Sequence, residues 1–135
     1  MEQQEFSDYI IPQLLKQFPQ FKEACIYKPN GIVDIEYKSK QGLLTLWITT
    51  QDKEITIGFS GGKNLDDFHT HMSLFGANTP DEELNEAINF INDIMNDKEL
   101  IIHSTVLGYL LGDINEIRKH AMPGEIIKDD VWSNL

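Results

Sequence analysis

The alternation of apolar and polar residues between positions 33 and 59 constrains this fold more than any other feature of the sequence. Val33, Ile35 and Tyr37 alternate with charged residues, which is the period of a β-strand with one face in water. The same period recurs twice, and short polar turns rich in Gly, Asn and Asp separate the runs. We therefore expect an antiparallel meander of four consecutive strands, at about 24–27, 33–38, 44–49 and 55–59.

Two other segments carry apolar residues at helical spacing. In the first, 6–18, Pro12 should either kink the helix or start its second part. The second begins at a capping box, in which Thr79 is the N-cap, Pro80 the first helical residue and Glu82 the third. Its apolar stripe should cover one face of the sheet, and it consists of Leu84, Ala87, Ile88, Ile91, Ile94 and Met95. Its acidic residues are expected on the solvated surface, and they are Glu83, Glu86, Asp93 and Asp97.

The last third of the chain predicts further strands. Residues 100–103 and 106–111 are strand-like with a break near Gly108, 113–122 could form a short helix, and 126–132 is strand-like again. The expected fold class is α+β with two layers: one mostly antiparallel sheet of about five to seven strands, covered by the N-terminal helix and by the amphipathic helix at about 80–97. The 135 residues are expected to form a single domain, 1–135.

The net negative charge of the chain indicates which classes of partner it can bind. The 22 acidic and 11 basic side chains give a formal net charge of −11, a field that repels nucleic acid and anionic lipid. The same field attracts a basic protein, and acidic inhibitors of nucleic-acid-cleaving enzymes place carboxylates where the enzyme would hold phosphates. The alternative is that the acidity only keeps a small protein soluble.

The compartment can also be predicted. The N-terminus has neither the positive charge nor the apolar stretch of a signal peptide, and the longest apolar runs are far shorter than a membrane-spanning helix. The single cysteine, Cys25, cannot close an internal disulfide and is expected at an ordinary buried or half-buried strand position. These features predict a cytoplasmic protein with no membrane partner.

The cluster Asp66-Asp67-Phe68-His69-Thr70-His71 is the most suggestive of chemistry. In an extended segment His69 and His71 point the same way and could share a metal ion, with nearby carboxylates as further ligands. The cluster resembles the Asp-x-His-x-His metal motif of amidohydrolase-like barrels, but those enzymes place it on the first strand of a barrel of about 200 residues or more. The favoured interpretation is that one histidine packs on the sheet and the other hydrogen-bonds a carboxylate or a carbonyl, so no metal and no cofactor are expected.

Other catalytic chemistry is not indicated. Cys25 has no cationic neighbour in sequence that would lower the pKa of its thiol. The segment Ser60-Gly61-Gly62-Lys63 lacks the spacing of a phosphate-binding Walker motif, and its two glycines are expected to make a turn. We therefore expect a protein that is not an enzyme.

The tail of the chain places Asp129 and Asp130 close to Trp132. If Trp132 is exposed, these are residue types that anchor protein interfaces. If Trp132 is buried, it completes the hydrophobic core. The sequence leaves both interpretations open.

The order of elements in 45–132 resembles that of small bacterial immunity proteins, the cytoplasmic antitoxins of polymorphic and contact-dependent toxins. The resemblance rests on the strand Glu54–Phe59, the His69-x-His71 pair, the acidic helix from Pro80 to Asp97 and the Trp132-Ser133 end, which is followed by Asn134 where such families often have glycine.

The resemblance implies a non-catalytic inhibitor, a monomer or small homo-oligomer, that binds the C-terminal domain of one cognate toxin. That domain is expected to be basic and is often a nuclease. The candidate contact residues are Asp66, Asp67, His69, His71, Asp129, Asp130 and Trp132. Two other functions remain open: a small metal-binding protein or metal-dependent enzyme that uses His69 and His71, and a general protein-interaction domain.

Overall fold

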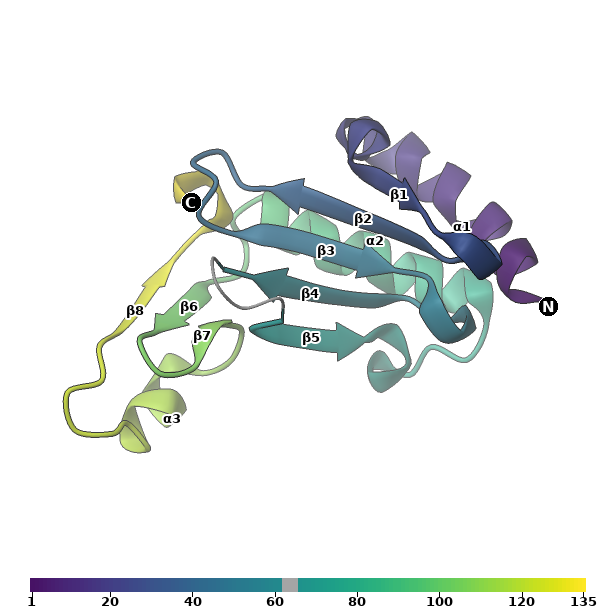
Figure 1. Ribbon diagram of the computed structural model, residues 1–135. Helices are drawn as coiled ribbons and strands as arrows, with labels where there is room; N and C mark the ends of the chain where they lie inside the picture. Colours follow the sequence, from purple (N-terminus) through teal and green to yellow (C-terminus); the bar gives the residue numbers. More distant parts are fainter. Residues whose placement is uncertain (62–65) are drawn as a thin grey trace.

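The computed structural model describes residues 1–61 and 66–135, and within them the chain forms two antiparallel sheets with α-helices packed beside them (Figure 1). Sheet A consists of β1 (Cys25–Tyr27), β2 (Val33–Lys38), β3 (Thr45–Thr49), β4 (Thr56–Ser60) and β5 (Phe68–His71). Sheet B consists of β6 (Ile101–Ser104), β7 (Gly108–Leu110) and β8 (Ile127–Asp130). The α-helices are α1 (Gln3–Gln17), α2 (Pro80–Met95) and α3 (Ile114–Lys119). Short 3-10 helices are η1 (Pro19–Ala24), η2 (Pro29–Gly31), η3 (Gln51–Lys53), η4 (Met72–Phe75) and η5 (Trp132–Asn134).

Sheet A contains the predicted four-strand meander as β1 to β4, and β5 adds a fifth strand that was not predicted. Its strands are hydrogen-bonded in chain order from β1 to β5, and each pair is antiparallel. The alternation seen in the sequence sets the register, because Ile35, Ile48 and Ile57 lie opposite one another and are at most 1% exposed. The predicted bend at Gly61-Gly62 lies partly outside the described residues.

The long helices α1 and α2 lie on the same side of sheet A (Figure 1). Their apolar stripes and the inner face of the sheet form one cluster of buried side chains, as predicted for these two helices. Each large apolar side chain buried in this way contributes about 1.5–3 kcal/mol to folding. The cluster includes Phe6, Ile10 and Leu14 of α1, Leu84, Ala87, Ile91 and Ile94 of α2, and Ile35, Leu46, Ile48, Ile57 and Phe59 of the sheet. Across the described residues, no helix is long and apolar enough to cross a membrane.

Pro12 lies inside α1, which continues through it from Gln3 to Gln17, so the proline does not start a separate helix. A proline within a helix leaves the carbonyl four residues earlier without its usual donor. Here both Pro12 and Asp8 are exposed, so water can satisfy the Asp8 carbonyl and the helix tolerates the proline.

The strands after α2 form sheet B instead of extending sheet A, so the expectation of one sheet is corrected while the α+β class is confirmed. In sheet B, β6 pairs with β7 on one side and with β8 on the other, which leaves neither of its edges for sheet A. The backbone N–H of Tyr109 in β7 donates to the Asp67 side chain, 3.0 Å away, and not to a backbone carbonyl of sheet A. Asp113 caps the short helix α3 by accepting from the N–H of Asn115.

A second prediction is wrong: Glu83 was expected on the solvated surface, but it is only 8% exposed. Its Oε1 accepts a hydrogen bond of 2.8 Å from the backbone N–H of Ile55, which precedes β4. Burial raises the pKa of the Glu83 carboxyl, the Ile55 N–H partly offsets this, and the charge of Glu54 adds to the rise. The helical pattern could not show this contact, because it depends on where the β3–β4 turn comes to lie.

We predict that Glu83→Gln changes how stability depends on pH. A carboxyl whose pKa is raised in the folded state stabilises the fold below its unfolded pKa of about 4.3, and this contribution is lost as the pH rises through the folded value. The amide keeps an acceptor for the Ile55 N–H but carries no charge to desolvate. Urea unfolding from pH 4 to 7 should therefore show the stability of Glu83→Gln improving relative to wild type as pH rises. Glu83→Leu leaves the Ile55 N–H without its acceptor, so it should lower the free energy of unfolding by about 1–3 kcal/mol. Parallel pH curves for wild type and Glu83→Gln would contradict this.

Candidate functional site

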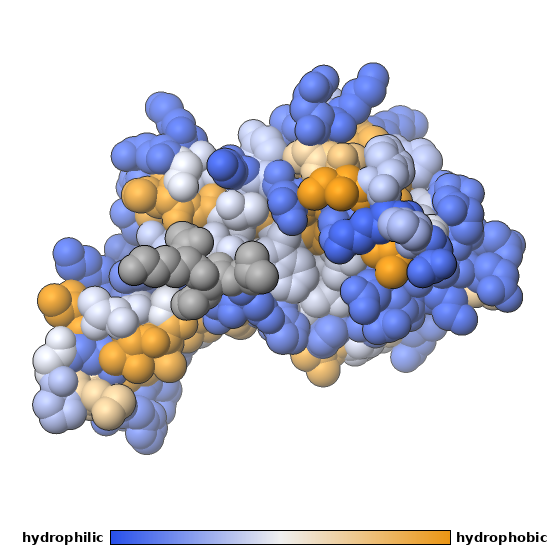
Figure 2. Space-filling model, viewed as in Figure 1, coloured by the Kyte–Doolittle hydropathy of each residue, from blue (hydrophilic) through white to orange (hydrophobic). Residues whose placement is uncertain are grey.

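The face of sheet A that the helices leave uncovered carries a hollow of about 530 Å³. We call it the acidic hollow, because its lining includes, among the described residues, the carboxylates of Asp34, Glu36, Asp52, Glu54 and Asp66. Figure 2 views this side of the molecule and shows hydrophilic residues bordering the sheet. The acidic hollow is therefore the best candidate for a binding site on this fold.

Strand register explains why these residues meet. On the face opposite the core, Glu36 of β2 lies across from Trp47 of β3, which lies across from Gly58 of β4, and Gly58 from His69 of β5. The adjacent row runs in the same order through Asp34, Thr49, Thr56 and His71. The polar half of the alternation thus forms the lining of the acidic hollow.

Trp47 forms the floor of the acidic hollow. A Cβ atom placed on Gly58 would lie 2.3 Å from Cζ2 of Trp47 and 2.5 Å from its Cε2. The indole therefore lies across β4 at the one position of that row without a side chain. Its Nε1 is buried and has no hydrogen-bond partner among the described residues, whereas the ring as a whole is partly exposed and lines the hollow. Trp47 therefore offers a ligand its ring and not its N–H.

His69 and His71 point to the same side of β5, as predicted, and their ring centroids are 5.3 Å apart. Each Nδ1 lies beside a carboxylate: 2.7 Å from Oδ2 of Asp66 for His69, and 2.7 Å from Oε1 of Glu54 for His71. Nδ1 of His71 is also 2.9 Å from the hydroxyl of Thr56. The His69 ring lies 6.2 Å from that of Trp47, so the two rings together form the aromatic part of the lining. Both histidines therefore contact a carboxylate, where only one was expected to do so.

A metal site at this pair would need at least one more ligand. Within residues 1–61 and 66–135, no group of three or more His, Cys, Asp and Glu side chains is arranged to hold a metal ion. The Nδ1 atoms of both histidines face carboxylates, so only the two Nε2 atoms would be available to a metal ion. The described residues therefore supply no third ligand for a metal ion at this pair.

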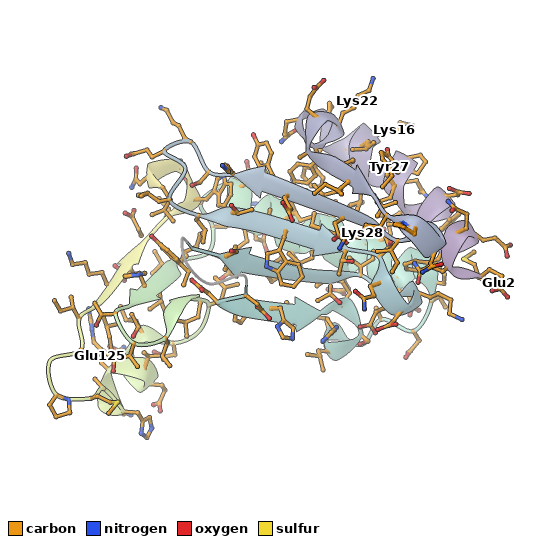
Figure 3. The ribbon with its side chains drawn as sticks, in the orientation of Figure 1. Glu2, Lys16, Lys22, Tyr27, Lys28 and Glu125 are labelled. Atoms are coloured by element: carbon orange, nitrogen blue, oxygen red, sulfur yellow. The ribbon has the colours of Figure 1, made fainter. Side chains whose placement is uncertain are left out.

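Basic side chains are scarce around the acidic hollow. No lysine or arginine in the described part of the chain lines it. Lys28, labelled in Figure 3, forms an ion pair with Asp34 and so reaches its edge. This contact and the charge of Glu36 raise the pKa of the Lys28 ammonium group, with the hydrogen bond to Asp34 as the main cause. The lining is consequently rich in negative charge.

Asp67 does not belong to the acidic hollow, although it follows Asp66 directly. Its Oδ2 accepts from the backbone N–H of Tyr109, which ties β5 to sheet B. A Cβ on Gly108 would lie 2.6 Å from the same oxygen, so the absence of a side chain there makes this approach possible. Burial, followed by the charges of Asp67 and Asp130, raises the pKa of the Tyr109 hydroxyl. Asp67 thus holds the two sheets together.

The predicted tail residues also lie away from the acidic hollow. Trp132 is 6% exposed and stacks on Tyr37 with ring centroids 6.3 Å apart, so the interpretation that buries it in the core is the one the structure supports. Asp130 accepts from the N–H of Val131 and the side chain of Asn134, and these bonds lower the pKa of its carboxyl, the Asn134 bond most. Asp129 is exposed on β8.

Sheet B carries an apolar groove of about 450 Å³. Its lining includes Val106 and Leu107, between β6 and β7, and Ile117 of α3. Glu125, labelled in Figure 3, holds the segment before β8 by accepting from the Ser104 hydroxyl and from the Met122 N–H. This groove lacks the concentration of charge found in the acidic hollow.

The residues that define the acidic hollow were only partly predicted. Asp66, His69 and His71 belong to the predicted motif, whereas Asp34 and Glu36 are predicted only as the wet face of a strand, and the sequence does not single out Trp47, Asp52 and Glu54 as site residues. Their alternation was a usable signal, because residues on the same face of neighbouring strands must lie side by side.

Fold and site together define an α+β protein with an acidic hollow over one tryptophan. None of three comparisons, with protein-family models, with curated proteins and with solved structures, gives a significant match.

We predict that Gly58→Ala displaces the Trp47 indole. The new methyl group would clash with two ring atoms and with the backbone oxygen of Phe68, 2.5 Å away, and the backbone cannot move aside as a flexible side chain could. The variant should lose about 1–3 kcal/mol of stability. In two-dimensional ¹H–¹⁵N spectra its Trp47 indole signal should shift, while that of Trp132 stays in place. An unchanged Trp47 signal would show that the ring does not lie over Gly58.

Proposed function

We propose that this chain is a protein-binding module that holds a basic partner on the open face of sheet A. The observation that carries the proposal is the lining of the acidic hollow. Among the described residues, it contains five carboxylates and Trp47, and no lysine or arginine. Such a surface is complementary to a cationic projection on another protein.

The charge of the whole chain supports the same partner. A net charge of −11 produces a long-range field that accelerates encounter with a basic protein. The carboxylates of the acidic hollow would then act at short range, where each desolvated charge pair contributes more than a pair at the rim. General solubility alone would not require acidic side chains to converge around an aromatic floor.

The resemblance to immunity proteins suggests which kind of basic protein this is. We propose the C-terminal domain of a cognate toxin, in which the acidic hollow would bind a cationic side chain that otherwise holds a phosphate group of the toxin's substrate. The contact residues proposed here are Glu36, Trp47, Asp66, His69 and His71. Asp67, Asp130 and Trp132 have structural contacts instead, and Asp129 is kept as a comparison.

The test compares three tagged proteins in pull-downs from the host, each analysed by quantitative mass spectrometry. They are the wild type, a face variant (Glu36→Gln, Asp52→Asn, Asp66→Asn) and a control variant (Glu23→Gln, Glu99→Gln, Asp129→Asn) that loses the same charge elsewhere on exposed positions. We expect a basic protein to be captured by the wild type and the control, and about tenfold less by the face variant at low salt. The deficit should shrink as salt is added.

Three results would contradict the proposal. If the face and control variants lose captured partner equally, only the total charge matters. If neither variant loses captured partner, the charge of these residues does not contribute to binding. Stoichiometric zinc or iron in the purified wild type, without a protein partner, would favour the metal-binding alternative at His69 and His71.

If the captured protein is a toxin domain, co-expression with the wild type should restore growth of the toxin-producing cell, and co-expression with the face variant should not.

A further inference from the structure

The acidic hollow has a feature that a purely charged surface would not need, which is its flat aromatic floor. Trp47 occupies the middle of the sheet, and its ring extends over Gly58 toward His69. Because Nε1 is buried, the exposed part of the indole is π surface and not a hydrogen-bond donor. A ligand that settles on this floor must therefore suit an electron-rich ring.

Carboxylates surround this floor. Glu36 lies directly across from Trp47 in the register of β2 and β3, is exposed, and forms no ion pair in the described part of the chain. The carboxylates of Asp66 and Glu54 lie on the other side, each beside a histidine. Asp34 is already paired with Lys28. A cation on Trp47 would thus meet Glu36 first, with further negative charge behind it.

We propose that the acidic hollow is an arginine-recognition site, in which a guanidinium group of the basic partner stacks on Trp47 and pairs with Glu36. This inference rests on the proposed function, because the partner supplies the arginine. A guanidinium is planar, weakly hydrated and able to stack on an aromatic face while it donates two parallel hydrogen bonds to a carboxylate. A lysine ammonium group is a compact, strongly hydrated point charge and gains less from a flat ring.

The acidic hollow is large enough to hold an arginine side chain. About 530 Å³ exceeds the space of one arginine side chain, and the open side of sheet A gives an extended segment of the partner access. The His69 ring, 6.2 Å from Trp47, would flank the same guanidinium. Arginine buried against tryptophan is the kind of contact that dominates the energy of many interfaces.

The experiment uses the full chain, labelled with ¹⁵N, and two small probes: N-acetyl-L-argininamide and N-acetyl-L-lysinamide. Each probe is titrated while the indole N–H signals of Trp47 and Trp132 are followed, with Trp47→Phe used to assign them. We expect a saturable shift of the Trp47 signal, an unmoved Trp132 signal, and binding of the arginine probe about threefold tighter than that of the lysine probe.

Variants separate stacking from charge. Glu36→Gln should weaken binding of the arginine probe about threefold. The matched change Glu23→Gln, at an exposed residue that does not line the acidic hollow, should leave the affinity unaltered. Trp47→Leu should remove the preference for arginine, and if it does not fold, Trp47→Phe should reduce the preference because the smaller ring holds a cation less well. Shifts in resolved backbone amides around Glu36 and His69 then report binding in place of the indole.

The outcomes distinguish the inference from the function on which it rests. Equal binding of the two probes, or no saturable binding of either, overturns the arginine site even if the pull-down captures a basic protein on this face. An arginine preference that disappears with Trp47→Leu and weakens with Glu36→Gln supports the site, even if the pull-down shows that the partner is not a toxin domain.

Discussion

The rest of the structure depends on the burial of one face of sheet A beneath α1 and α2. Strand residues alternate between faces, so each apolar residue committed to the core places its neighbour on the opposite side. Ile35, Ile48 and Ile57 pack against the helices, and the residues beside them, such as Glu36 and Trp47, have no place except the open face. The acidic hollow is therefore a direct product of the pattern that folds the sheet.

Two glycines adjust this arrangement at points where a side chain would not fit. Gly58 lets the Trp47 indole lie across β4, and Gly108 lets the Asp67 carboxylate reach the N–H of Tyr109. The first shapes the floor of the acidic hollow, and the second fixes β5 to sheet B. Because β5 carries His69 and His71, the link to sheet B also steadies one wall of the site.

The sequence predicts most elements and the pairing of neighbouring strands, but not β5 or the contacts between elements far apart in the chain. Alternation and the Thr79 capping box identify the meander and α2, because both signals are local. The separation of sheet B, the burial of Glu83 and the stacking of Trp132 on Tyr37 each depend on a residue far away in the chain, which no local period encodes. In the site, the histidine motif marked the segment that forms β5, but Trp47 and Glu36 become a site only through strand register.

Gathering carboxylates on one face opposes folding, since like charges repel one another in the compact state. The structure offsets part of this repulsion at the margin of the acidic hollow, where Lys28 pairs with Asp34. Glu36, next to Trp47, has no such ion pair among the described residues. Negative charge without an ion-pair partner is thus present beside the aromatic floor, which is the arrangement expected if a cation from another molecule completes the site.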